Sequence, residues 1–141
     1  MVSIKRLLAV LVLIAVQGCS EENYLQVALH PDYLPIFWVS EDEDFQSYGS
    51  ITSLRVYVRG DEPLEDRTYW YIEVPYRGPH HPPGNRTQTP VKLSRIIYSV
   101  VPQGFNKKLT PRPLEPGVEY CVTISGHPGA EDLIECFIYR P

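Results

Sequence analysis

The chain has 141 residues, of which 17 are acidic and 13 are basic, so its formal net charge is −4. This negative balance argues against a nucleic-acid partner and against electrostatic binding to anionic lipid. The length suits one domain, and the 14 prolines and 9 glycines along the chain argue against long helices.

The N-terminus reads MVSIKRLLAVLVLIAVQGCS, with a basic start at Lys5 and Arg6 and an apolar stretch over 7–16. That stretch is shorter than the roughly 20 apolar residues that a membrane-spanning helix needs. The tetrapeptide that ends at Cys19 (VQGC) resembles the lipobox of bacterial prolipoproteins. The resemblance implies cleavage after Gly18, acylation of Cys19 and durable anchoring by several acyl chains. An ordinary secretory signal with an incidental cysteine is the alternative.

This interpretation divides the chain into a signal peptide (1–18), a short lipidated linker (19–23) and one domain (24–141). Ser20 after the cysteine favours the outer membrane in Gram-negative lipoproteins, with the domain facing the periplasm. Since Lys5 and Arg6 leave with the signal, the mature chain keeps 11 basic and 17 acidic residues, a formal net charge of −6.

Cys121 and Cys136 remain once Cys19 is acylated, and each lies in a segment that reads as a strand. Pro128-Gly129 lies midway between them at a turn signal, so a hairpin centred there places the two cysteines opposite each other. An exported domain meets an oxidising compartment, which favours a disulfide. Two free thiols or a metal-binding pair are the alternatives.

Alternation of apolar and polar residues with period two recurs after the signal, in short runs bounded by turn residues. We expect an acidic turn over 40–50, a long loop over 76–90 and an irregular segment over 102–113. Ile96, Tyr98 and Val100 should share one face of their strand. About seven strands in this pattern predict an all-β sandwich. The expected strands are 24–29, 35–39, 51–59, 68–75, 91–101, 118–125 and 133–139.

The segment LEPGVEYCVTI, from Leu114 to Ile124, resembles the fibronectin type III pattern that leads into the sixth strand of that immunoglobulin-like sandwich. The resemblance implies that Tyr120 forms a tyrosine corner, in which the hydroxyl bonds to backbone upstream. Val118 replaces the usual threonine. The motif carries no information on activity, because such folds support many functions.

No catalytic or metal-binding pattern emerges from the sequence. His80 and His81 are adjacent in an extended loop, while His30 and His127 lie far from them along the chain, so we expect no metal centre. A Gly-x-Ser-x-Gly motif is absent, and no free cysteine remains for thiol chemistry. We therefore expect neither a cofactor nor an enzyme activity.

Tyrosine is abundant, with 10 residues, and alternation places several tyrosines on the polar faces of two neighbouring strands. Tyrosine and arginine are favoured at protein interfaces, and aromatic rings also stack on sugars. The alternative is that these rings only cover a solvated sheet face. The candidate binding face comprises Arg55, Tyr57, Arg59, Tyr69, Tyr71 and Glu73.

The chain resembles the small lipoproteins of Proteobacteria. We expect a non-catalytic envelope lipoprotein that acts as a binding or assembly module for a protein or glycan partner, without nucleic acid. An inhibitor or immunity lipoprotein that plugs a hydrolase with the 76–90 loop is one alternative. A subunit of a secretion or transport complex is another.

Overall fold

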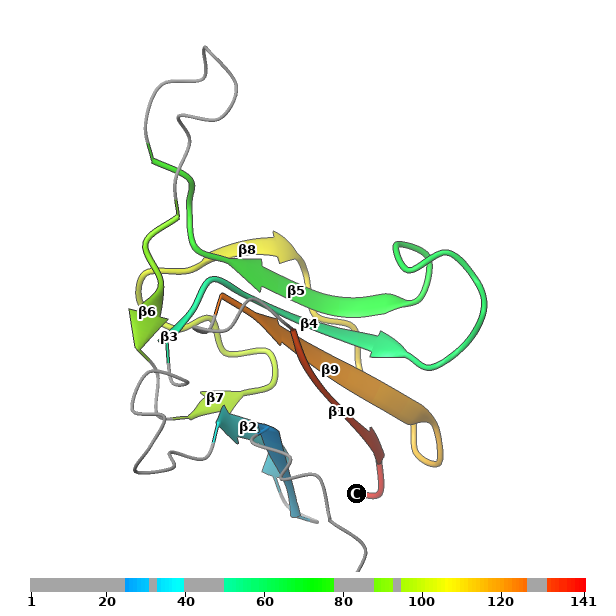
Figure 1. Cartoon of the computed structure of the whole chain (residues 1–141). Coiled ribbons are helices and arrows are strands. Elements are labelled where there is room, and N and C mark those ends of the chain that lie inside the picture. The colour runs from blue at the N-terminus through cyan, green and yellow to red at the C-terminus, as the bar shows by residue number, and fades with distance from the viewer. Residues whose placement is uncertain (1–24, 31–32, 40–49, 78–87, 93–94, 127–131) are drawn as a thin grey trace, which may run out of the picture.

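The computed structural model describes residues 25–30, 33–39, 50–77, 88–92, 95–126 and 132–141. Within these ranges the chain forms ten strands and no helix, which confirms the predicted all-β class. Every strand pair is antiparallel, and two sheets pack as the layers of a β-sandwich (Figure 1). This arrangement of a small two-sheet domain is compatible with an immunoglobulin-like fold.

The larger sheet has five strands in the order β10-β9-β4-β5-β8. Two neighbouring pairs in this order, β9–β10 and β4–β5, are consecutive along the chain, as is common in antiparallel sheets. The members are β4 (Ser53–Val58), β5 (Thr68–Glu73), β8 (Asn106–Leu109), β9 (Glu119–Ser125) and β10 (Leu133–Ile138).

The smaller sheet has three strands in the order β1-β2-β7. β1 (Leu25–His30) and β2 (Tyr33–Val39) form a hairpin, and β7 (Ile96–Ile97) adds a short third strand beside β2. A separate two-stranded ribbon pairs β3 (Ser50–Ile51) with β6 (Val91–Lys92).

The core lies between the two sheets and is built by the alternating apolar residues that the sequence shows. Leu54 and Val56 on β4 and Trp70 on β5 are fully buried, and Phe37 from β2 meets them from the smaller sheet. The Trp70 ring stands edge-on to Tyr98, with 5.3 Å between ring centroids. Each fully buried side chain of this kind contributes about 1.5–3 kcal/mol by leaving water.

The predicted strand over 91–101 is wrong, because this segment is broken into β6, β7 and a turn. Ser99 adopts a left-handed backbone with φ of 69°, and the Val100 N–H donates to the Ile97 carbonyl at 3.0 Å. Ile96 and Tyr98 are buried as expected, but Val100 is 52% exposed.

The irregular segment that we predicted over 102–113 is also partly wrong. Residues 106–109 form β8, which extends the larger sheet beyond β5. The segment reads NKKL, and three of its four residues are exposed, so alternation of apolar residues does not mark it as a strand. Pairing with β5 creates this strand where the local pattern gives no signal.

The β9–β10 hairpin confirms the predicted disulfide. Cys121 lies directly opposite Cys136 in the strand register, their Cα atoms are 4.0 Å apart, and the two sulfur atoms are bonded. At the start of β9 the Tyr120 hydroxyl accepts the backbone N–H of Glu115 at 2.8 Å, which is the type of bond a tyrosine corner makes. Leu114 packs against the core beside it.

The predicted signal peptide, the predicted cleavage position at Gly18 and the predicted lipidation site at Cys19 lie outside the described residues. In the part of the chain that the structure describes, no helix has the length and apolar character needed to cross a bilayer. The domain predicted from residue 24 is described from Leu25 onward.

Gly126, which follows β9, should tolerate no side chain. Its φ is +95°, and a Cβ there would lie 2.6 Å from the Thr52 backbone nitrogen, so Gly126→Ala should destabilise the domain by about 1–3 kcal/mol. Gly60→Ala is the control, because nothing lies within 4 Å of a Cβ there, and its effect should stay within about 0.5 kcal/mol. Urea denaturation measures both, and equal midpoints for the two variants would refute the clash.

Removing the disulfide should lower the free energy of unfolding. The double variant Cys121→Ala and Cys136→Ala frees a loop with a sequence separation of 15 residues in the unfolded chain. Chain entropy gives an expected loss of about 3 kcal/mol. Urea denaturation of the variant and of the reduced wild type should give the same loss, and an unchanged midpoint in both would contradict the prediction.

Candidate binding groove

The outer face of the larger sheet carries the polar side chains that alternate with the core residues. On β4, Arg55 and Tyr57 point outward while Leu54 and Val56 are buried. The register sets Arg55 opposite Tyr71 of β5 on one side and opposite Thr123 of β9 on the other. Cross-strand neighbours on one face lie close enough to interact directly, so these side chains form one surface.

Arg55 and Tyr71 form a stacked pair at the centre of this surface. The Arg55 guanidinium carbon lies 4.2 Å from the centroid of the Tyr71 ring, a cation–π contact worth about 0.5–1 kcal/mol where solvent reaches it. One guanidinium nitrogen donates to the Thr68 hydroxyl at 3.4 Å. Among the described residues Arg55 forms no ion pair, so most of its five N–H groups stay available to a ligand.

The Tyr71 hydroxyl is held by Glu73, to which it donates a hydrogen bond. Partial burial raises the pKa of Tyr71, and the hydrogen bond to the Glu73 carboxylate raises it further. Tyr71 therefore stays protonated at neutral pH, and its hydroxyl is oriented along the strand.

Tyr57 and Arg67 form a second stacked pair beside the first. The Arg67 guanidinium carbon lies 5.3 Å from the Tyr57 ring centroid, and the Thr123 hydroxyl donates to the Tyr57 hydroxyl at 3.2 Å. Arg67 is fixed by two backbone acceptors, the carbonyls of Glu62 at 2.6 Å and of Val58 at 3.0 Å. The pair is therefore anchored to the connection between β4 and β5.

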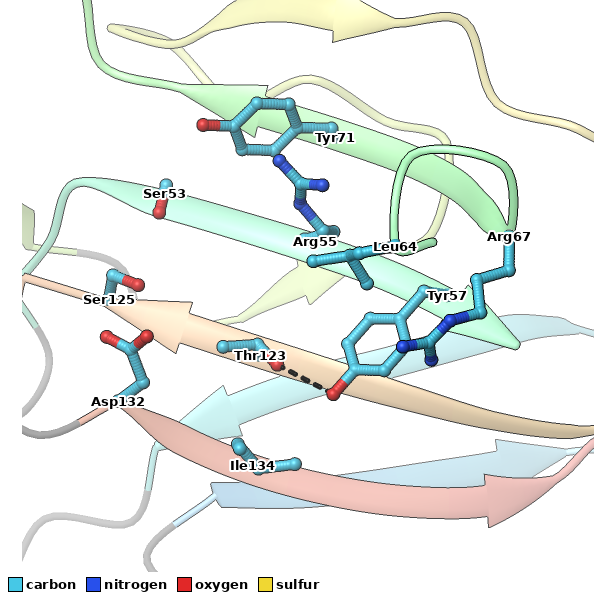
Figure 2. Close-up of a pocket in the computed structure, with 10 residues that line it drawn as sticks. All are labelled: Ser53, Arg55, Tyr57, Leu64, Arg67, Tyr71, Thr123, Ser125, Asp132 and Ile134. Carbon is cyan, nitrogen blue, oxygen red and sulfur yellow. Dashed lines mark hydrogen bonds between the residues drawn. The ribbon is translucent and has the colours of Figure 1, made fainter. Parts of the chain in front are cut away.

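These side chains line an open groove of about 430 Å³ (Figure 2), a size that suits a small ligand or a short segment of a larger one. Figure 2 shows Arg55 reaching toward the Tyr71 ring, with Leu64 and the Tyr57–Arg67 pair along one side and Asp132 at the β10 side. A second hollow of about 290 Å³ shares Arg55 and Tyr71 and extends toward Lys108 of β8.

The groove offers hydrogen-bond donors, hydroxyl groups and aromatic rings, which are groups that recognition surfaces use. In the described ranges no three His, Cys, Asp or Glu side chains gather in a way that could hold a metal ion. The cation-rich centre at Arg55 and the carboxylate of Asp132 give the two parts of the groove opposite charge. A ligand with both polar and flat apolar parts complements such a surface.

Tyr69, which the sequence places on the candidate binding face, does not line this groove. A β-bulge shifts the β4–β5 register between Val56 and Tyr57, so Thr68, not Tyr69, lies opposite Tyr57. Tyr69 is partly buried and packs against the edge of the core, where its ring meets the core ring of Tyr120 edge-on, 5.1 Å away. The Tyr69 hydroxyl donates to the Glu115 carboxylate at 3.1 Å.

Arg59 also lies outside the groove. It follows the end of β4, where it forms a 2.8 Å ion pair with Glu119. The hydrogen bond and the charge of Glu119 raise the pKa of Arg59. Both side chains are largely exposed, and such surface pairs contribute little to stability. Of the six predicted face residues, Arg55, Tyr57 and Tyr71 line the groove, and Glu73 supports it through Tyr71.

The groove is also lined by residues that the strand pattern does not predict. Among them are Leu64 and Arg67 from the connection between β4 and β5, and Asp132 and Ile134 from the β10 side. Strand periodicity does not place loop residues, so no local signal marks the first two. Most of the alternative 76–90 loop (78–87) lies outside the described residues, as do His80, His81 and His127.

Set against known proteins, the chain matches no protein family, no curated protein and no solved structure.

Tyr69 should make stability sensitive to alkaline pH. Burial and the hydrogen bond to Glu115 raise the pKa of Tyr69 from 10.0 to about 12 in the folded state. Stability from this group is complete below pH 10 and is lost as the pH rises toward 12, because the unfolded chain releases the proton first. Burial also raises the pKa of Tyr98, so Tyr98 adds a second loss of stability at alkaline pH, which remains when Tyr69 is replaced.

Denaturation midpoints measured between pH 9 and about pH 12 test this, with Tyr69→Phe as the comparison. The variant should lose less stability over this interval than the wild type, since it has no Tyr69 proton to release. Parallel curves for the two proteins would show that Tyr69 titrates alike in the folded and unfolded states.

Proposed function

We propose that the protein is a lipid-anchored, non-catalytic module of the bacterial cell envelope that binds a protein or glycan partner through the groove. The groove combines two arginines, each stacked on a tyrosine, with hydroxyl groups on the outer face of a rigid sheet. This is the observation that carries the proposal, since Tyr and Arg dominate the energetics of recognition surfaces.

The geometry of the two pairs supports recognition because it lowers the entropy lost on binding. Arg67 is fixed by backbone carbonyls, Tyr57 by Thr123 and Tyr71 by Glu73, so three of the four side chains are held before a ligand arrives. Binding loses less free energy when the contacting side chains are ordered beforehand.

The proposal keeps the lipid anchor at Cys19, the outer-membrane location and the fibronectin type III-like assignment of the sandwich. The anchor is supported by the lipobox resemblance around Gly18 and Cys19. The assignment is supported by the hydrogen bond between the Tyr120 hydroxyl and the Glu115 N–H. The lipid then supplies location and the groove supplies specificity.

Affinity capture of the lipidated protein from its own cell envelope, with mass spectrometry of the captured material, tests the proposal. The double variant Tyr57→Ala and Tyr71→Ala removes both stacked rings from the groove and should lose a stoichiometric partner. Sedimentation with purified peptidoglycan tests a glycan partner with the same variants.

Tyr33→Ala is the matched control, because Tyr33 is 68% exposed and belongs to the other sheet. The control should retain the partner. A partner that the double variant also retains would exclude the groove as the binding site. Absence of any protein or glycan partner in the wild type would contradict a binding module.

A further inference from the structure

The outer face of the smaller sheet is apolar, in contrast to the polar outer face of the larger sheet. Residues that alternate with the buried set point away from the core, and the register aligns Ala28, Ile36 and Ile97 in one row across β1, β2 and β7. Leu34 and Trp38 flank this row on β2, and Gln26, which lies opposite Trp38 on β1, is uncharged. We call Ala28, Leu34, Ile36, Trp38 and Ile97 the apolar face.

Solvent still reaches this face in the isolated chain. Leu34 is 39% exposed and Ile97 is 44% exposed, and the other three members are partly exposed. The β2 sequence from Leu34 to Val39 reads LPIFWV, a continuous apolar run typical of a strand that is covered on both faces. The core covers one face of β2. The continuous apolar run therefore indicates that the other face of this strand also contacts an apolar surface.

We propose that the apolar face rests on a lipid bilayer, so that the smaller sheet is the membrane-facing side of the domain. This inference rests on the lipid anchor of the proposed function. Cys19 precedes Leu25 by six residues, which span at most about 22 Å when fully extended. β1 itself is about 20 Å long, so the acyl chains can reach the bilayer anywhere beneath this sheet.

The side chains on the apolar face have the chemistry that a bilayer interface accepts. Leucine and isoleucine gain free energy by leaving water, and tryptophan prefers the level of the lipid headgroups. Neither the five residues of the apolar face nor the neighbouring Gln26 carries a formal charge. Since the mature chain is acidic overall, contact must be apolar rather than electrostatic, and added salt should not weaken it.

This orientation has a direct consequence for the groove. The groove occupies the outer face of the larger sheet, on the opposite side of the sandwich from the apolar face. A domain that rests on its smaller sheet therefore presents Arg55, Tyr57 and Tyr71 away from the membrane, where a partner can approach.

The chain has two tryptophans, which makes fluorescence a direct test. Trp38 lies on the apolar face, whereas Trp70 is fully buried between the sheets and serves as an internal reference. The mature acylated protein is incorporated into protein-free phosphatidylcholine vesicles whose acyl chains carry bromine, which quenches tryptophan at short range. Trp38 emission, isolated by comparison with Trp38→Phe, should shift to shorter wavelength and be quenched, equally at low and high salt.

Ile97→Glu places a charge on the apolar face and should abolish most of the quenching. Ile138→Glu is the matched control, because Ile138 is 41% exposed on β10 of the other sheet and does not line the groove, and it should quench like the wild type. Sedimentation with the vesicles is measured in the same samples. Circular dichroism of each variant verifies that the sandwich is folded.

The outcomes separate the two proposals. Unquenched Trp38 in protein that sediments with vesicles would overturn the lipid contact while leaving the anchor intact, and would leave the apolar face to a protein partner. Failure of the wild type to sediment would overturn the anchor and the orientation together. If Ile97→Glu is quenched as strongly as the wild type, the lipid anchor alone brings Trp38 near the bilayer. This outcome would also overturn the proposal.

Discussion

The alternation of side chains along β4 and β9 is the constraint on which the rest of the structure depends. These two central strands bury Leu54, Val56, Val122 and Ile124 on one face, which fixes the orientation of the larger sheet against the smaller one. The same register also determines the other face of the sheet, where Arg55 lies between Tyr71 and Thr123. Core packing and groove geometry therefore depend on one strand register. A slip of one residue would turn the buried side chains to the outer face and the groove side chains to the core.

The bulge between β4 and β5 is the local departure that shapes both layers. Tyr69 contacts Tyr120 and Glu115 beside this bulge, and the small side chain of Thr68 lies next to Arg55. A tyrosine at that outer position would fill the space beside the Arg55–Tyr71 stack. Thr68 instead lines the second hollow, together with Lys108.

Strand positions could be predicted from the sequence where apolar and polar residues alternate clearly. They could not be predicted where pairing with a distant strand determines the structure. Alternation located β4, β5 and β9 within a residue or two, and the turn signal at Pro128-Gly129 predicted the cysteine pairing. The bulge that sets Thr68 opposite Tyr57 has no marker in the sequence, because its cause is the fit between two strands. β8 and the broken segment over 91–101 likewise depend on neighbours far along the chain, and the loop residue Arg67 enters the groove through contacts that no period describes.

The placement of the first and last strands has a consequence for how the chain acquires its fold. β1 packs beside β10, and β9 with β10 supplies one edge and a central strand of the larger sheet. A chain that is synthesised from its N-terminus can form the β1–β2 hairpin early, but it cannot close the sandwich until β9 and β10 have been made. Both cysteines also lie in these two strands, so oxidation follows the same delay. Closure of the sandwich and formation of the disulfide therefore both wait for the last strands of the domain, and the apolar residues of the earlier strands stay uncovered until then.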